Sequence, residues 1–116
     1  MSISIGFFRV TNQSSDKIHC SVVYKLKDGS IHTARLQPRP KVGAGKTKKF
    51  DLRFVPELTN GIQVWLEAKI AGGGNPTTQG GEDDKLALEM GHKATAEFEV
   101  DAGFPAPGVT YVGLGT

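Results

Sequence analysis

The feature of this sequence that most restricts its fold is the alternation of apolar and polar residues with a period of two. The clearest case is Lys46–Phe54, in which apolar side chains alternate with charged ones. This spacing is typical of a β-strand with one buried face and one wet face. No segment sustains the 3.6-residue period of an amphipathic helix, so the sequence predicts an all-β protein.

Short turn signals separate eight segments of this kind. These segments are Ile3–Thr11, Ile18–Leu26, Ile31–Leu36, Lys46–Phe54, Ile62–Ile70, Leu86–Met90, Ala94–Val100 and Val109–Leu114. Asp28-Gly29 predicts a tight hairpin, and Thr59-Asn60-Gly61 predicts another turn. A short helix is the competing interpretation for Leu86–Met90, because Leu, Ala, Glu and Met are good helix formers.

About eight short strands in 116 residues predict a single-domain antiparallel β-sandwich over 1–116, immunoglobulin-like or jelly-roll-like, with a small barrel as the alternative. A chain of this length can bury a core without metal or disulfide staples. The single cysteine permits no internal disulfide. Collagen-like, coiled-coil and helical membrane-spanning classes are excluded, since glycine has no three-residue period, heptads are absent and apolar runs are short.

Two stretches break the strand pattern. The prolines and glycines between Pro38 and Gly45 predict a connection. The range 71–85 holds five Gly, one Pro and three consecutive acids (Glu82, Asp83 and Asp84), a composition that predicts a long mobile loop. The acids could bind calcium, but their spacing matches no EF-hand, and a solvated acidic loop is the favoured interpretation.

The net charge of +2 hides a strong asymmetry between the two halves of the chain. Met1–Phe54 carries eleven Lys or Arg against three acids, a net +8, whereas Val55–Thr116 carries three Lys against nine acids, a net −6. Such asymmetry suggests an electropositive face for an anionic partner. In a two-layer β fold, however, basic and acidic strands can lie side by side and cancel, and this is the favoured alternative.

One segment looks like the end of a nucleotide phosphate-binding loop, Gly43-Ala44-Gly45-Lys46-Thr47. Pro40 holds the place where that loop needs its first glycine. The residues that follow alternate as a strand, where the loop should open a helix. A glycine turn before a basic strand is therefore the preferred interpretation.

The sequence contains no convincing catalytic or metal-binding set. Cys20 and His19 are adjacent in one predicted strand, so they point to opposite faces and cannot readily pair. Cys20 falls on the apolar face, which predicts a buried and inert thiol. His19 and His32 could meet across the Asp28-Gly29 hairpin, but three histidines with no cysteine spacing are weak evidence for a metal. We expect no enzymatic activity, no metal and no cofactor.

The best candidate for a binding surface is a set of cations at one hairpin end and the adjoining connection, supplemented by two aromatic side chains. The predicted ligand-binding residues are Arg35, Arg39, Lys41, Lys46, Lys48, Lys49, Trp65 and Tyr111. Such cations suit phosphate, sulfate or anionic headgroups, and aromatic rings stack on sugars or lie at membrane interfaces. Alternation puts Trp65 on the polar face of its strand, where it is either covered by a neighbouring loop or offered to a ligand.

These observations predict a non-catalytic recognition module that binds an anionic or glycan-bearing surface through a basic hairpin end and mobile loops, with self-association left open. A membrane-active or lipid-binding sandwich and a structural or assembly subunit are the alternatives. Nucleic acid is disfavoured, because stacking aromatics are not interleaved with the cations and the pI is only about 8.8. The N-terminus lacks a recognisable leader, which predicts a cytoplasmic protein, leaderless export or a processed chain. Asn12-Gln13-Ser14 matches the short and common glycosylation acceptor pattern.

Overall fold

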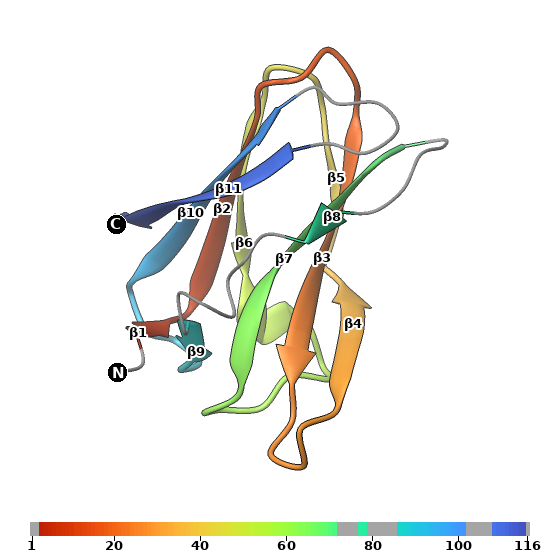
Figure 1. Ribbon diagram of the computed structural model, residues 1–116. Helices are drawn as coiled ribbons and strands as arrows, with labels where there is room; N and C mark the ends of the chain where they lie inside the picture. Colours follow the sequence, from red (N-terminus) through yellow and green to blue (C-terminus); the bar gives the residue numbers. More distant parts are fainter. Residues whose placement is uncertain (1–2, 72–76, 79–85, 102–107, 116) are drawn as a thin grey trace.

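The computed structural model describes residues 3–71, 77–78, 86–101 and 108–115 (Figure 1). Most of the loop predicted over 71–85, including Glu82, Asp83 and Asp84, lies outside the described residues. No described segment forms a helix with the length and apolar character needed to cross a membrane.

Among the described residues, eleven strands form two sheets that pack together, which confirms the predicted all-β sandwich. The larger sheet has the order β1 (Ile3–Ile5), β9 (Leu86–Leu88), β7 (Gln63–Ile70), β3 (Ile18–Lys25) and β4 (Ile31–Arg35). In addition, β5 (Lys41–Val42) pairs with β3, and β8 (Thr77–Thr78) pairs with β7. The smaller sheet has the order β11 (Gly108–Gly115), β10 (Thr95–Asp101), β2 (Phe7–Asn12) and β6 (Thr47–Asp51).

The sheets are mixed and not purely antiparallel, because β1 runs parallel to β9 and β2 runs parallel to β10. The single strand predicted over Ile3–Thr11 is divided at Gly6. The part before Gly6 is β1 of the larger sheet, and the part after it is β2 of the smaller sheet. A Cβ at Gly6 would lie 2.3 Å from the carbonyl oxygen of His92, so the backbone can pass here only without a side chain.

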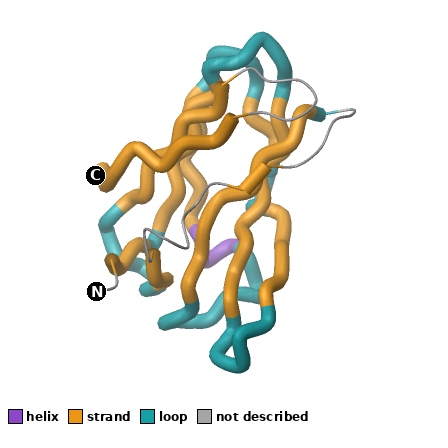
Figure 2. Tube along the Cα trace, in the orientation of Figure 1, coloured by secondary structure: helices purple, strands orange, loops and turns teal. Residues whose placement is uncertain are grey.

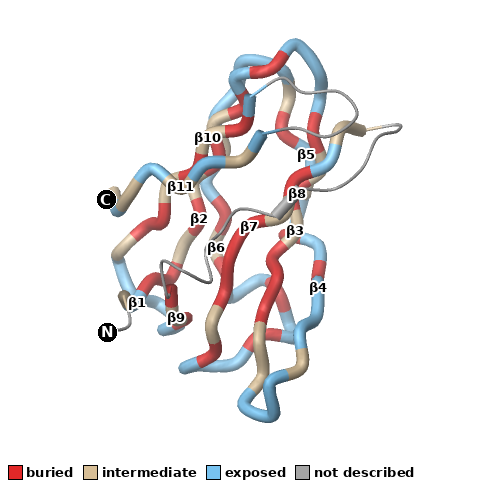
Figure 3. The backbone as a smooth tube through the Cα atoms, viewed as in Figure 1, coloured by how far each residue is buried: buried red, intermediate tan, exposed pale blue. Residues whose placement is uncertain are grey.

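The core lies between the sheets and is built from the inward faces of their strands, as Figure 3 shows by the buried positions that alternate along them. Its largest members are phenylalanines, and Phe8 meets Phe98 edge to face with ring centroids 4.9 Å apart. The alternation in the sequence therefore correctly predicts which side of most strands faces the core.

The strand predicted over Lys46–Phe54 is shorter than expected. It ends at Asp51, and Leu52–Phe54 forms the 3-10 helix η1, the short helical segment in Figure 2. The Asp51 carboxylate accepts a hydrogen bond from the backbone N–H of Arg53 and pairs with its guanidinium at 2.6 Å, which lowers the pKa of Asp51. The turn directs Phe54 to solvent, where it is 61% exposed, although alternation predicts it inside. Leu86–Leu88 is a strand, so the helical alternative is wrong.

Asn12, at the end of β2, is a fully buried polar residue that joins several loops. Its side-chain nitrogen donates to the carbonyl oxygens of Asp16, Val42 and Gly43 at 2.7, 3.1 and 3.2 Å. Its side-chain oxygen accepts from the backbone N–H and the hydroxyl of Ser14 at 3.0 and 2.7 Å. This amide is buried and hydrogen-bonded, so in the folded protein Asn12 has a structural role and its side chain is not accessible for glycosylation.

Replacing Asn12 by alanine should lower the free energy of unfolding by about 2–4 kcal/mol, because the buried carbonyls of the loops lose their donor. Urea denaturation measures the loss. Gln13→Ala, at the exposed neighbouring position, is the control and should change stability by less than about 0.5 kcal/mol. A loss below about 1 kcal/mol for Asn12→Ala would show that water replaces the amide without cost.

Thr95 presents the opposite case, since it is fully buried and its hydroxyl oxygen has no hydrogen-bond partner among the described residues. Thr95→Val keeps the branched shape and removes the unpaired hydroxyl, so it should raise the free energy of unfolding by about 1–2 kcal/mol. The same substitution at the exposed Thr33 is the control. Destabilisation by Thr95→Val in a urea titration would mean that the hydroxyl has a partner.

Candidate functional site

A groove with a volume of about 550 Å³ opens where an edge of the larger sheet meets an edge of the smaller one. Seven of the described residues line it, and we call them the basic groove: His19, Arg35, Pro38, Arg39, Pro40, Lys41 and Lys48. Four of the seven are lysine or arginine. The volume lies within the range of small-ligand sites, which is about 300–1,000 Å³.

The groove forms because β4 and β5 pair with the same edge of β3 but leave a gap between them. The backbone N–H of Leu36 donates to the carbonyl of Cys20 at 3.3 Å, and the N–H of Cys20 donates to the carbonyl of Pro40 at 2.7 Å. The residues between Leu36 and Pro40 thus leave the ladder, as expected for a segment in which proline removes backbone donors. This excursion carries Pro38 and Arg39 outward to form one wall of the groove.

Lys48 reaches the groove from β6, which belongs to the other sheet. It shares the inward face of β6 with Phe50, and its ammonium lies 5.1 Å from the centroid of the Phe50 ring. Its Nζ donates to the backbone carbonyl of Arg39. Partial burial, and secondly the charge of Arg39, lower the pKa of Lys48. Lys48 therefore links the two sides of the groove, because its ammonium lies near the Phe50 ring and donates to the carbonyl of Arg39.

The field in the groove is positive. Arg35, Arg39 and Lys41 are exposed, and none of them takes part in an ion pair among the described residues. The strand register places His19 opposite Lys41 on β5 and Lys69 on β7. Burial lowers the pKa of His19 most, followed by the charges of Lys41, Arg35, Lys69 and Lys17. His19 is therefore mostly neutral at pH 7, and the fixed cations around it suit an anion.

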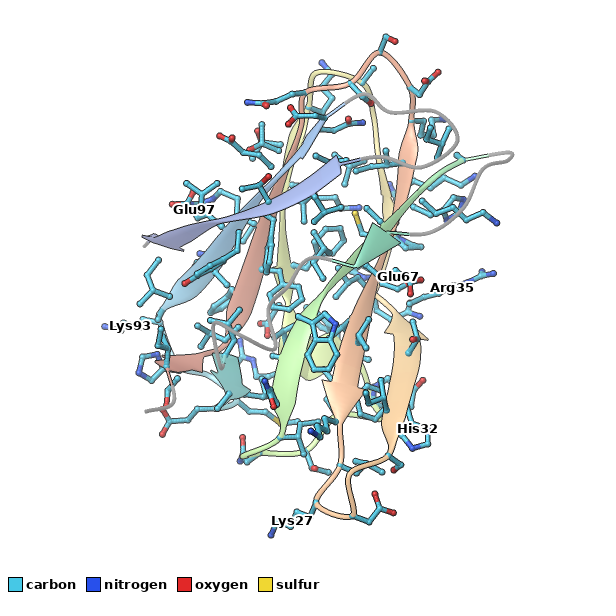
Figure 4. All side chains as sticks on the ribbon, in the orientation of Figure 1. Lys27, His32, Arg35, Glu67, Lys93 and Glu97 are labelled. Carbon is cyan, nitrogen blue, oxygen red and sulfur yellow. The ribbon has the colours of Figure 1, made fainter. Side chains whose placement is uncertain are left out.

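Glu67 lies in the same row of the larger sheet as Arg35. It lies opposite Ser21, which lies opposite Arg35 on its other side, so the backbone positions of Glu67 and Arg35 are about two strand spacings apart, roughly 10 Å. Figure 4 shows Arg35 extending from the edge of the larger sheet, with Lys27 at the hairpin tip and Lys93 on the opposite side of the molecule. Glu67 does not line the groove.

The structure brings four of the predicted cations together and leaves two elsewhere. Lys46 is exposed in a turn just before β6, and its backbone N–H donates to the carbonyl of Gly43. This is the glycine turn before a strand that the sequence predicts. Lys49 points to the other face of β6, where its ammonium lies 4.4 Å from the Phe7 ring centroid. Alternation along β6 separates Lys49 from Lys48.

The two predicted aromatic ligands do not line the groove. Trp65 lies opposite Val23 and outside the main core, on the face that alternation predicts, but it is only 5% exposed. It is therefore covered, and no ring face is offered to a ligand. Tyr111 is partly buried against the core, with its ring centroid 5.5 Å from that of Phe98.

Sequence reasoning missed three residues of the groove, namely His19, Pro38 and Pro40. In the sequence the two prolines indicate only a break in the strand pattern, although a strand edge that prolines interrupt is where a hollow can form. The sequence also leaves open a contact between His19 and His32 across the Asp28-Gly29 hairpin, and the strand register keeps the two apart. His32 lies opposite Tyr24 and stacks on its ring at 5.5 Å, whereas His19 pairs with Lys41.

Cys20 lies next to the groove but faces the core. It is fully buried, and burial raises the pKa of its thiol to about 12. The prediction of a buried thiol is therefore confirmed, and a thiol with a raised pKa forms little of the reactive thiolate at neutral pH. Among the described residues, no three His, Cys, Asp or Glu side chains come close enough to hold a metal ion.

The structure shows where the oppositely charged halves of the chain meet. On the outer face of the smaller sheet, Arg9 of β2 pairs with Glu97 of β10 at 2.9 Å, so the halves interleave and cancel there. In the groove the cations all come from the first half, and no carboxylate is among the described residues that line it. Charges of the two halves thus pair on the outer face of the smaller sheet, whereas the groove keeps the positive charge of the first half.

No model of a known protein family matches the chain, and no curated protein matches it. Among solved structures it is similar to a chain in the structure of a disulfide locked mutant of Intermedilysin with human CD59, with a TM-score of 0.45 and 10% identity. It is also similar to a chain in a structure described as "Trapped Toxin", with a TM-score of 0.42 and 10% identity. Each match covers 92% of this chain but 23% of the other, so the chain spans about a quarter of their length.

The lowered pKa of His19 leads to a test of the field in the groove. NMR titration of the His19 ring should give a pKa below 6.5, and Lys41→Gln should raise that value because the cation opposite His19 is removed. A base with a lowered pKa in the folded state binds fewer protons than in the unfolded state, so its contribution to stability falls as the pH drops below 6.5. Lys27→Gln, far along the hairpin, should leave the titration unchanged. An unshifted pKa of His19 would contradict a positive field in the groove.

Proposed function

We propose that this protein is a non-catalytic recognition module that binds an anionic group of a glycan or lipid surface through the basic groove. The observation that carries the proposal is the convergence of cations from both sheets on one groove, with no carboxylate among the described residues that line it. Charges brought together without partners oppose folding, and a bound anion would relieve their repulsion.

The chemistry of the lining suits a phosphate or sulfate group. The guanidinium groups of Arg35 and Arg39 can each donate two parallel hydrogen bonds to such an oxyanion, whereas Lys41 acts as a compact positive charge. Pro38 and Pro40 supply rigid apolar contacts. Because three of the cations are exposed, they can also attract an anion over a distance before contact.

The membrane-active alternative receives less support from the site itself. It depends on exposed aromatic side chains beside the cations, but Trp65 is covered and Tyr111 packs against the core. The recognition of a charged group does not require either ring. We therefore base the proposal on the cations alone.

Charge reversal tests the proposal. The double variant Arg39→Glu with Lys41→Glu should bind a sulfated glycan such as heparin, and vesicles containing phosphatidylserine, at least about tenfold more weakly than the original protein, a loss of about 1.4 kcal/mol. The salt dependence of binding should also become flatter, because fewer charges are neutralised on binding. Isothermal calorimetry with heparin and vesicle co-sedimentation provide the two measurements.

The matched control is Lys27→Glu with Lys93→Glu, which changes the net charge equally at two exposed positions away from the groove. This control should keep most of the affinity. Equal loss in both double variants would attribute binding to net charge alone and contradict a role for the groove, as would unchanged affinity in the groove variant. A loss confined to heparin or to vesicles identifies the source of the anion.

A further inference from the structure

A row of side chains leads from the basic groove onto the outer face of the larger sheet. The strand register places His19 of β3 between Lys41 of β5 and Lys69 of β7. The residue after His19, Cys20, and its partner Ala68 are fully buried, so the side chains of this row point away from the core. Lys69 is not among the residues that line the groove. The row therefore carries positive charge from the groove onto the open face of the sheet.

Lys17 adds a further cation at the same end of the sheet. It precedes β3, and its backbone carbonyl accepts a hydrogen bond of 2.9 Å from the N–H of Ala71, just after β7. Lys17 and Lys69 are exposed, and neither takes part in an ion pair among the described residues. Burial lowers the pKa of His19 most, and the charges of both lysines contribute. We call Lys17 and Lys69 the row lysines.

The row lysines have two acidic neighbours along their own segments of chain. Glu67 lies two residues before Lys69 on the same face of β7, and Asp16 directly precedes Lys17. Neither acid forms an ion pair among the described residues. The four cations of the groove and the two row lysines outnumber these acids by four, so this end of the sheet is positive.

The cations follow a longer path than one anion can occupy. The path begins at Arg39 and Lys48, passes through Lys41 and ends at the row lysines beyond β3. The backbone positions of Lys41 and Lys69 are about two strand spacings apart, roughly 10 Å. A single phosphate or sulfate group accepts charged hydrogen bonds over about 2.7–2.9 Å, so it reaches only one part of this path. A chain that carries several anionic groups can contact all of it.

The other side chains of this surface indicate which kind of polyanion it fits. Single-stranded nucleic acid is held by stacking on aromatic rings, but Trp65, the aromatic residue of β7, is only 5% exposed. None of the large exposed hydrophobic residues of the described chain lies in the groove or in the row, so this surface offers no such side chain for insertion into a membrane. A sulfated polysaccharide needs neither feature, because it presents its charges along a polar chain.

We propose that the groove and the row lysines together bind one chain of a sulfated polysaccharide, with one sulfate group in the groove and another at Lys17 and Lys69. This two-position binding rests on the proposed function of the groove and extends it by a class of partner and two residues. Because both sulfate groups belong to one chain, binding of the first places the second at a high effective concentration. His19 lies between the two positions and has a ring N–H to donate.

Isothermal calorimetry with long-chain heparin tests this inference. The row variant, Lys17→Gln with Lys69→Gln, should bind heparin at least about fivefold more weakly than the original protein, with a flatter salt dependence. The control, Lys27→Gln with Lys93→Gln, removes the same charge at two other exposed positions and should change the affinity by less than about twofold. Glu67→Gln removes the acid beside Lys69 and should strengthen binding by about twofold. Circular dichroism checks that all variants are folded.

Inorganic sulfate separates this inference from the groove proposal. A free sulfate ion needs only the groove, so its binding, followed by NMR shifts of the backbone amides of Arg39 and Lys41, should be equal in the original protein and the row variant. Heparin fragments of increasing length complete the test. Affinity should rise from a disaccharide to a longer chain, and the rise should be smaller in the row variant, because its second position is weakened.

The possible outcomes distinguish the two proposals. Equal heparin affinity of the row variant and the original protein, an equal loss in the control, or affinity that does not depend on chain length would overturn two-position binding and leave the groove proposal standing. Heparin binding that depends on the row lysines but not on Arg39 and Lys41 would overturn both. A loss in the row variant that is confined to phosphatidylserine vesicles, or to a single-stranded oligothymidylate, would contradict the assignment to a polysaccharide.

Discussion

The buried amide of Asn12 is the interaction on which the rest of the structure depends. The chain passes from the smaller sheet to the larger one after β2 and returns after β5. Asn12 donates to Asp16 in the first passage and to Val42 and Gly43 at the start of the second. Its backbone N–H and carbonyl also pair with Lys46 and Gly45. One side chain therefore fixes both passages between the sheets, in a core where an unpaired carbonyl would be costly.

The basic groove is a consequence of this closure. It is lined by residues of β3, β4, β5 and β6 and of the segment between β4 and β5, and the relative position of β5 and β6 is set by the turn that Asn12 holds. Lys48 adds a direct link from β6 to the carbonyl of Arg39. The cations are thus placed by backbone interactions and not by carboxylate partners. This leaves the charge of the groove uncompensated within the described lining and free to act on a ligand.

The two edges of the smaller sheet have opposite properties. At β6 the lysines both protect the edge and supply charge to the groove, whereas β11 is uncharged and exposes Val112 and Leu114.

Alternation alone determined the all-β class, the core-facing residues of most strands and the inert burial of Cys20, because the direction of a side chain along a strand depends only on its neighbours in sequence. The charges themselves, including the opposite sign of the two halves, are also a property of the sequence. The direction of Phe54 was not predictable in this way, because the Asp51 cap ends the strand and starts a 3-10 turn.

Tertiary structure decided what pairs with what. Gly6 divides one predicted strand between two sheets because the backbone of His92 lies against it, and this contact joins residues far apart in sequence. The same is true of the groove, where Lys48 joins Arg39 and is separated from Lys49 by the pleat of a single strand. Trp65 was placed on the correct face, but its cover comes from the fold. Local pattern fixes the side on which a residue lies, whereas contacts between distant segments decide which residues share a site.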